Sequence, residues 1–409
     1  MYLEKTVMPD NIQPAEVSFA KGSSILLEGK PNTSKFYIIK EGNVQITRET
    51  DSIMPRENNA GPGEMLGVVS VMASRNYIES VVALTDVVLM AVEQNQIIRN
   101  ASLAMNIIKQ FSKRLRKLNE IFSKRVIMKS TSDDPSNILE IAAFYEKSKK
   151  YNQALYAYEQ YLVYCPNGVH KKNVEERAVK IKTAISATRP DYSPDTMKQK
   201  WAKDNLLFVE GEAGHNLYII QEGSVKITKI ANNNEVVLAI LKKGDVVGEM
   251  AMLEDKPRAA TAEINENCTL LSVNQSNFTN LVKEQPDMVI RLISLMADRI
   301  WYRYRQLTNT IIENPLGRIY DALLIQLEKE RINLNETNSY QCDFTFKELT
   351  GMAGITGVNT DELYNKVYSS RRITLENNKV HILNIASIIK EAEYYRRARE
   401  MGKDLREKI

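Results

Sequence analysis

The chain has 409 residues and a formal net charge of +4, with 43% hydrophobic and 26% charged residues. This length and composition are ordinary for two or three globular domains, which excludes a disordered chain. The amino-terminal residues lack a secretion signal and no long apolar run occurs, so we expect a cytoplasmic protein without membrane-spanning helices.

The three cysteines, Cys165, Cys268 and Cys342, are odd in number and lack the short spacings of a metal site. The three histidines are equally scattered. We therefore expect reduced thiols, no metal and no catalytic cofactor. Because no nucleophile–base pair is visible either, the sequence predicts that the chain is not an enzyme.

The first predicted elements are short strands, with glycine where hairpins must close. The same order of signals returns about 181 residues later. The matching segments are 27–29 with 209–211, 36–46 with 217–227, and 63–67 with 244–248. We interpret each set as a small jelly-roll barrel, so that the chain contains an internal repeat.

A helical segment follows the first barrel. Its apolar residues have helical spacing and are Ile107, Ile108, Phe111, Leu115, Leu118 and Phe122. Residues 99–130 contain nine Lys or Arg against the single acidic residue Glu120. Such a basic stripe could attract nucleic acid or an acidic partner, and a solvated helix face explains it as well.

Residues 135–166 resemble a single tetratricopeptide repeat. The residues at its consensus positions are Ile138, Ile141, Ala142, Tyr145, Ala154, Tyr158, Tyr161 and Pro166. Because one repeat cannot bury its own apolar face, the helix pattern at 174–185 is expected to pack on it. The segment is a helical linker or a surface for a protein partner, and Pro190 to Pro194 marks the boundary to the second barrel.

The second barrel contains the most informative segment, Gly248 to Thr261. Gly248 allows a tight turn into a short helix whose first N–H groups face an anion. The guanidinium of Arg258 can pair with phosphate oxygens, and Glu249 can accept a hydroxyl proton from a ribose. The segment resembles the phosphate-binding cassette of cyclic nucleotide-binding domains. This resemblance implies ligand contacts at Val247, Gly248, Glu249, Met250, Ala251, Arg258, Ala259 and Ala260.

The first barrel departs from this pattern, because Val68 stands at the position of Glu249 and Tyr77 at that of Arg258. A phosphate would be desolvated there without a cationic partner. We predict that the first barrel does not bind a cyclic nucleotide in the manner of the family. Arg75 lies close by and could be recruited instead.

A long helix is predicted from about Pro286 to Asn309, with apolar residues at alternating spacings of four and three. These seam residues are Ile293, Ala297, Ile300, Tyr304, Leu307 and Ile311. The region resembles the catabolite activator (Crp/Fnr-like) regulators, in which the equivalent helix forms the dimer interface and covers the nucleotide base. The resemblance implies a homodimer joined through these residues.

The same resemblance bears on the identity of the base. Where that family places small hydroxyl residues against the adenine, this chain has Arg303 and Tyr304, and either could stack on a purine. Ala259 lacks the hydroxyl that relatives selective for cyclic GMP often carry. The expected ligand is therefore cyclic AMP, with cyclic GMP or another cyclic nucleotide as the alternative.

The carboxy-terminal part has the signals of a winged helix-turn-helix. They are a helix at 346–352, a glycine-containing turn from Gly354 to Gly357, a helix at 359–369 and a hairpin at 373–382 that turns at Asn377-Asn378. In the family, the second helix enters the major groove. Here the turn is longer than usual, and the helix begins with the acidic residues Asp361 and Glu362.

Residues 340–390 carry six basic and five acidic side chains, which gives little non-specific attraction to DNA. If DNA is bound, the expected contacts are Asn359, Thr360 and Asn365 to bases, and Lys366, Arg371 and Arg372 to phosphates. The alternative is a winged fold that serves protein contacts or dimerisation.

Together these patterns predict an α+β multidomain chain. Its predicted parts are a degenerate barrel (1–100), a helical linker (101–190), a competent barrel (191–285), a dimerisation helix (286–312) and a winged helix-turn-helix-like domain (313–409). The resemblance implies a cyclic nucleotide receptor that acts as a ligand-controlled, DNA-binding transcription regulator. The alternative is a cyclic nucleotide-responsive signalling adaptor that docks a partner protein. Ion channels with such domains are excluded, since they need membrane-spanning helices.

Overall fold

The computed structural model describes residues 15–54, 58–98, 100–127, 136–185, 192, 196–231, 234–355 and 359–400. Four positions used in the sequence predictions, Arg99, Pro190, Pro194 and Gly357, lie outside these residues. The described residues fall into two compact units. The larger unit contains those within 1–119, 131–235 and 239–301, and the smaller unit those within 120–130, 236–238 and 302–409.

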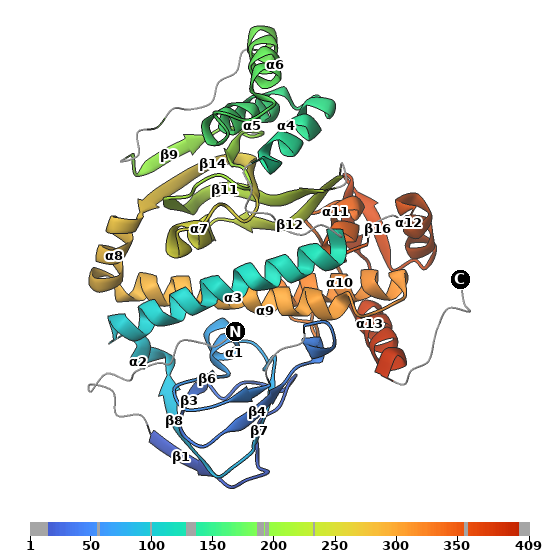
Figure 1. Cartoon of the computed structure of the whole chain (residues 1–409). Helices are drawn as coiled ribbons and strands as arrows, with labels where there is room; N and C mark the ends of the chain where they lie inside the picture. The colour runs from blue at the N-terminus through green and yellow to red at the C-terminus, as the bar shows by residue number, and fades with distance from the viewer. Residues whose placement is uncertain are drawn as a thin grey trace. The chain divides into compact units, whose positions relative to one another are not determined.

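The larger unit begins with a β-domain, residues 15–93, made of two four-stranded antiparallel sheets (Figure 1). The strand orders are β1-β8-β3-β6 and β2-β7-β4-β5. The elements are β1 (Ala15–Phe19), β2 (Ser24–Leu26), β3 (Lys35–Glu41), β4 (Val44–Thr47), a 3-10 helix (Glu49–Ser52), β5 (Asn59–Ala60), β6 (Met65–Leu66), α1 (Val68–Ala73), β7 (Ser80–Ala83) and β8 (Val87–Glu93). Buried and exposed residues alternate along β4, as expected when one face of a sheet covers the core.

The second β-domain, residues 198–274, repeats this plan with longer strands. Its elements are β9 (Lys198–Trp201), β10 (Leu206–Phe208), β11 (Asn216–Ala231), β12 (Asn234–Lys242), β13 (Val246–Val247), α7 (Glu249–Glu254) and β14 (Thr261–Asn274). β11 and β14 pair along most of their length, with register shifts between Ile220 and Val225. Such bulges bend a strand pair. The single bent pair β11–β14 therefore corresponds to two separate pairs in the first β-domain, β3–β8 and β4–β7.

Helices connect and follow the two β-domains. They are α2 (Gln94–Ile98), α3 (Ala101–Ile127), α4 (Asn137–Lys147), α5 (Tyr151–Tyr164), α6 (Lys171–Ala184), α8 (Gln275–Glu284) and α9 (Pro286–Asn309). The residues predicted at the repeat's helix positions in α4 and α5 are buried. Ala142 and Ala154 are fully buried, which lets α4 and α5 approach closely.

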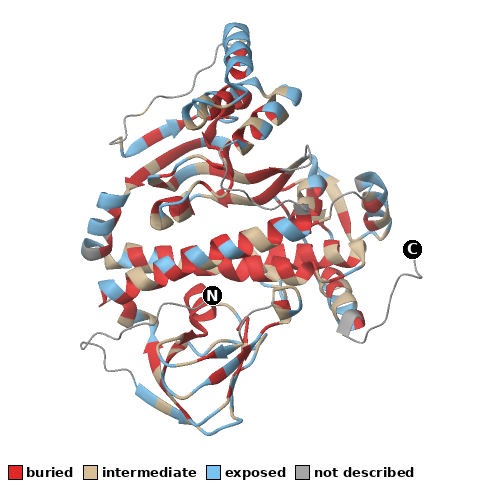
Figure 2. Cartoon of the chain, in the orientation of Figure 1, coloured by how far each residue is buried: buried red, intermediate tan, exposed pale blue. Residues whose placement is uncertain are grey.

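The predicted seam of α9 is buried within the single chain (Figure 2). Ile293, Ala297, Ile300, Tyr304 and Leu307 are at most 5% exposed, and Ile311 is half-buried. The five buried side chains leave no apolar surface for a second copy of the chain. The prediction that they join two copies is therefore corrected.

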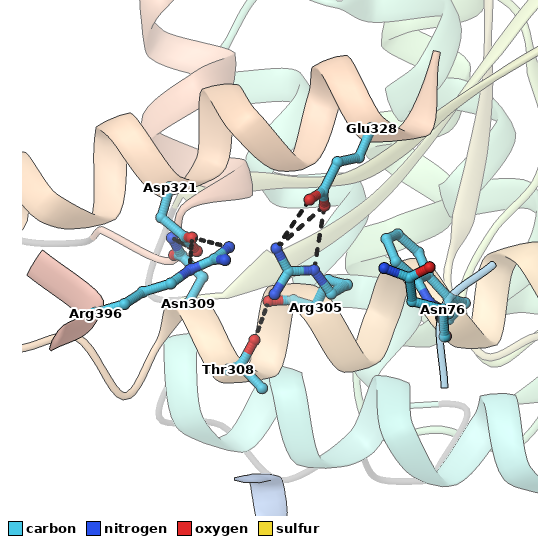
Figure 3. A network of polar contacts seen from close by, with 8 residues as sticks. Asn76, Arg305, Thr308, Asn309, Asp321, Glu328 and Arg396 are labelled. Carbon is cyan, nitrogen blue, oxygen red and sulfur yellow. Dashed lines mark hydrogen bonds and ion pairs between the residues drawn. The ribbon is translucent and has the colours of Figure 1, made fainter. Parts of the chain in front are cut away.

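The helix beside α9 is α3 of the same chain, as Figures 1 and 3 show. Within the larger unit, Gln94, shortly before α3, donates to Ser294 of α9 over 3.3 Å. Within the smaller unit, Arg125 near the end of α3 donates to Thr310 over 2.7 Å. The two helices therefore run in the same direction. Because α3 follows the first β-domain as α9 follows the second, the internal repeat provides both sides of the seam.

We expect the chain to be monomeric in solution because its seam is filled from within. Light scattering coupled to gel filtration should give a mass near 46.6 kDa. Charge reversal at the exposed Lys172 is a control that should leave this mass unchanged. A mass near twice this value would contradict the expectation and would show that another surface pairs two copies.

The smaller unit contains α10 (Pro315–Lys329), β15 (Tyr340–Gln341), α11 (Phe346–Met352), α12 (Thr360–Ser369), β16 (Ile373–Glu376), β17 (Lys379–Ile382) and α13 (Ile385–Glu400). The two predicted helices and the hairpin are present. Asn377 and Asn378 both have positive φ, as a two-residue hairpin turn requires. Thr345 and Glu348 form a capping box that fixes the start of α11.

Ionic contacts hold the helices of the smaller unit together (Figure 3). Asp321 of α10 is buried and accepts from Asn309 over 2.9 Å and from Arg396 of α13 over 2.6 Å. Arg305 pairs with Glu328 at 3.1 Å. The guanidinium of Arg396 therefore joins α13 to α10.

Candidate functional site

The most distinctive polar group of the second β-domain is the guanidinium of Arg258. It is 5% exposed, and its Nη1 donates to the carbonyl of Gly248 over 2.7 Å. Gly248 has a φ of +83° and directly precedes α7. A Cβ at Gly248 or at Gly214 would collide with the guanidinium. Both glycines are therefore needed for the close approach of Arg258.

The surroundings of Arg258 suit an anion. Its guanidinium carbon lies 4.2 Å from the centre of the Phe208 ring, and burial lowers the pKa of Arg258 against the opposing effects of Tyr218 and Glu212. Nε of Arg258 is buried and has no hydrogen-bond partner among the described residues. A buried cation with an unused donor gains most from a charge-assisted bond to an anion.

Glu249 is the first residue of α7 and lies nine residues before Arg258 in the sequence. Its side chain is fully buried. Its Oε1 accepts from Nη1 of Arg299 over 2.7 Å, and Arg299 also donates to the carbonyl of Val246. In the part of the chain that the structure describes, Oε2 of Glu249 has no partner. The carboxylate is held by a cation on one oxygen and can accept a ligand hydroxyl on the other.

The remaining predicted cassette residues are apolar and line α7 and the segment before β14. Val247, Ala251 and Ala260 are buried, and Met250 and Ala259 are half-buried. The sequence interpretation missed Arg299, which lies in α9, 50 residues after Glu249. The only sequence signal for Arg299 was a cation in the predicted long helix, and the structure shows that α9 brings this cation beside the cassette.

A family profile described as the cyclic nucleotide-binding domain matches residues 16–100 and 198–285. The chain therefore contains two cyclic nucleotide-binding domains. Its second domain carries both polar residues of the cassette, Glu249 and Arg258, and its first domain carries neither.

Relatives of known function match part of the chain. The cAMP-activated global transcriptional regulator CRP of Salmonella typhimurium is 28% identical over 157 residues, which are 38% of this chain and 74% of that protein. A CRP-like cAMP-activated global transcriptional regulator of Mycobacterium tuberculosis is 26% identical over 175 residues, 42% of this chain and 75% of the relative. A solved structure of a CooA mutant from Carboxydothermus hydrogenoformans is 17% identical, with a TM-score of 0.42, and covers 50% of this chain and 92% of its own.

The cassette of the second cyclic nucleotide-binding domain is also bound by α3. Ser112 and Arg116 donate to Glu254, at the end of α7, over 2.6 and 2.8 Å, and Arg116 donates to the carbonyl of Pro257. The side chains of Arg116 and Glu254 are both buried. Arg116 was predicted to belong to a basic stripe for solvent or nucleic acid, and this prediction is corrected.

In the first cyclic nucleotide-binding domain, Tyr77 occupies the space that corresponds to the Arg258 guanidinium. Its ring is buried and faces Gly67, the residue before α1. Its hydroxyl lies 3.1 Å from the hydroxyl of Thr33. A neutral ring with its polar end already bonded has no charge to offer a phosphate.

The buried carboxylate of Glu79 binds the turn before α1 in the first domain. Its Oε1 accepts the N–H of Gly67 over 2.7 Å, and its Oε2 is paired with Arg48. Burial alone would raise the pKa of Glu79, but Arg48, Arg114 and the Gly67 N–H outweigh it and lower the pKa to about 2. The second domain has Ala260 at the corresponding position. The sequence interpretation missed this acid, which supplies a negative charge to the first cassette.

Arg75 does not replace the missing arginine. Its Nε pairs with Asp298 of α9 at 2.8 Å, and its guanidinium lies 5.0 Å from the centre of the Trp301 ring. Trp301 in turn donates to the carbonyl of Asn76 over 3.1 Å. The suggestion that Arg75 could be recruited to the first cassette is therefore wrong, since Arg75 binds α9.

The predicted base contacts, Arg303 and Tyr304, are buried in the smaller unit. The guanidinium carbon of Arg303 lies 4.6 Å from the centre of the Phe122 ring of α3. Arg303 therefore already stacks on an aromatic face. Contact of either residue with a base stays a prediction.

The predicted DNA contacts cluster on and after α12. Asn359 caps this helix, because its side chain accepts the N–H groups of Asp361 and Glu362. Lys366 pairs with Glu362 at 2.8 Å, and Arg372 pairs with Glu391 at 2.6 Å. Asn365 and Arg371 are exposed, and the side chain of Thr360 lies outside the described residues. The structure therefore places the predicted DNA contacts in one region. Three of them, Asn359, Lys366 and Arg372, already make contacts within the chain.

Among the described helices, none is both long and apolar enough to cross a membrane. The described residues also contain no cluster of three or more His, Cys, Asp or Glu that could hold a metal ion.

Proposed function

We propose that the second domain binds one cyclic mononucleotide through Arg258 and Glu249. The observation that carries the proposal is a pair of buried polar atoms, Nε of Arg258 and Oε2 of Glu249, that lack partners among the described residues. The guanidinium would pair with exocyclic phosphate oxygens, and the carboxylate would accept the proton of the ribose 2′-hydroxyl. Arg299 holds this carboxylate in place through a hydrogen bond to its Oε1.

The proposed ligand is cyclic AMP, with cyclic GMP or another cyclic nucleotide as the alternative. Support comes from the names of two relatives, which describe them as cAMP-activated. Ala259 also offers no hydroxyl to a guanine.

The proposed output is transcription regulation through DNA. Helices α11 and α12 and the β16–β17 hairpin follow one another in the order of a winged helix-turn-helix. In this proposal, nucleotide binding changes the DNA affinity of that segment, and a tenfold to hundredfold change needs only about 1.4 to 2.8 kcal/mol of coupling. A signalling adaptor that docks a partner protein is the second candidate, favoured by the acidic start of α12 and the engaged Lys366 and Arg372.

DNA binding should depend on both the nucleotide and the exposed Arg371. We expect duplexes selected from a random pool at low salt to bind the chain about tenfold more tightly with cyclic AMP than without it. Arg371→Glu should weaken binding to every duplex, since the new carboxylate repels phosphates. Fluorescence anisotropy measures both effects, and Lys172→Glu on the exposed face of α6 is the matched control. A pool without any nucleotide-dependent duplex would favour the adaptor.

A further inference from the structure

The helices α4–α6 are docked on the second domain and do not form a free linker. Their buried residues form one apolar core with Leu206, Val209 and Ile230 of that domain. Lys150, just before α5, and Gln153 also reach the buried carboxylate of Glu263, both at 3.3 Å. Apolar and ionic contacts together fix the face of α5 that meets the domain.

A third contact leads from α5 towards the proposed phosphate site. The hydroxyl of Tyr156, a buried residue of α5, donates to Oε2 of Glu212 over 2.7 Å. The same oxygen accepts the N–H of Val209 over 3.0 Å. One of the donors that hold the carboxylate of Glu212 thus comes from the helical module.

The main chain of Glu212 is bonded to Arg258 itself. The carbonyl of Glu212 accepts the N–H of Arg258 over 2.7 Å, and the carbonyl of Arg258 accepts the N–H of Gly211 over 3.0 Å. A single residue, Glu212, therefore separates the α5 hydroxyl from the arginine: Tyr156 holds the carboxylate of Glu212, and the carbonyl of Glu212 holds the backbone of Arg258.

Charge gives this arrangement a further effect. Burial lowers the pKa of Arg258, and the negative charge of Glu212 opposes that effect, so the carboxylate acts on the guanidinium electrostatically. A released carboxylate could turn to the guanidinium and compete with a phosphate for it. The first domain keeps the same pair of main-chain bonds, between Tyr77 and Gly29 and Lys30, but has the cation Lys30 in place of Glu212.

We propose that Tyr156 is a positioning residue for the phosphate site, and that the α4–α6 module tunes nucleotide affinity through it. This inference rests on the proposed function, since it assigns a role at the same site. Tyr156 directs the Glu212 carboxylate to the N–H of Val209 and away from Arg258. Docking of the module on the second domain and binding of a cyclic nucleotide therefore stabilise each other.

Calorimetry on the 409-residue chain tests the proposal with whichever of cyclic AMP and cyclic GMP the unmodified chain binds more tightly. We expect Tyr156→Phe to weaken binding about tenfold, which equals about 1.4 kcal/mol. Adding Glu212→Gln should restore affinity to within about twofold of the Glu212→Gln single variant, because no charge remains to compete. Tyr158→Phe is the matched control, since that hydroxyl on the same helix bonds to Glu146 within the module.

The outcomes separate this inference from the proposed function. Thermal melting first shows that each variant is folded at the temperature of the titration. If Arg258→Ala abolishes binding and Tyr156→Phe does not change it, the positioning role is wrong and the nucleotide site stands. An equal loss with Tyr158→Phe would also overturn the role, because a general weakening of α5 would then explain both results. Absence of binding by the unmodified chain would overturn both proposals.

Discussion

Replacing Arg258 with alanine is expected to weaken cyclic nucleotide binding by about tenfold or more, because one charge-assisted hydrogen bond alone contributes about 1.5 to 3 kcal/mol. Arg258→Lys should recover little of this affinity, since an ammonium group cannot reproduce the planar fork held between Gly248 and Gly214. Calorimetry measures the affinity, and circular dichroism shows whether the fold is intact.

The matched control is Lys256→Ala, which removes an exposed cation two residues away and should leave the affinity unchanged. The titrations should also show one nucleotide per chain. Unchanged affinity in a folded Arg258→Ala variant would refute the assignment of the cassette. Two nucleotides per chain would mean that Tyr77 and Glu79 do not close the first domain to ligand.

Removing the charge of Glu79 is expected to destabilise the first domain by about 3 kcal/mol or more, because breaking a buried ion pair leaves an uncompensated charge. Glu79→Gln keeps the shape of the side chain but leaves Arg48 and Arg114 facing a neutral group. Denaturant unfolding measures the loss, and Glu16→Gln in an exposed pair with Lys40 is the control that should not change the midpoint.

The stabilisation of the first domain by Glu79 should depend on pH in a defined direction. The pKa of Glu79 falls from 4.5 to about 2 on folding, so its ionised form is the one that the native state favours. The stabilisation is therefore fully present above about pH 4.5 and is lost as the pH falls towards 2. Melting curves of the unmodified chain and of Glu79→Gln should converge in that interval. A constant difference down to pH 2 would contradict this account.

The sequence was most informative where the chemistry is local. Gly248, Glu249 and Arg258 lie within one short segment, and their proposed roles follow from residue type and spacing, so the sequence alone is enough to predict the cassette. Arg299 and Tyr156 were missed because folding brings them to the site from helices far away in the sequence. A local pattern contains no record of such neighbours.

The apolar pattern of α9 was recognised, but its partner was not. Periodicity identifies the face of a helix that must be covered and does not identify the covering surface. The surface that covers α9 is provided by α3, the equivalent helix of the same chain. Arg116 shows a related limit, because counting charges along α3 does not reveal which of them are buried against an acidic partner.

The pairing of α3 with α9 has a consequence for the shape of the dose–response curve. In a symmetric dimer, two identical sites share one seam and can influence each other's occupancy. Here the two sides of the seam have diverged, since Glu79 supplies a permanent internal anion on one side and the other side alone has the cassette chemistry. With the single proposed nucleotide site, binding would follow a simple hyperbola, so the protein would report nucleotide concentration gradually over about two decades and would not act as a threshold switch.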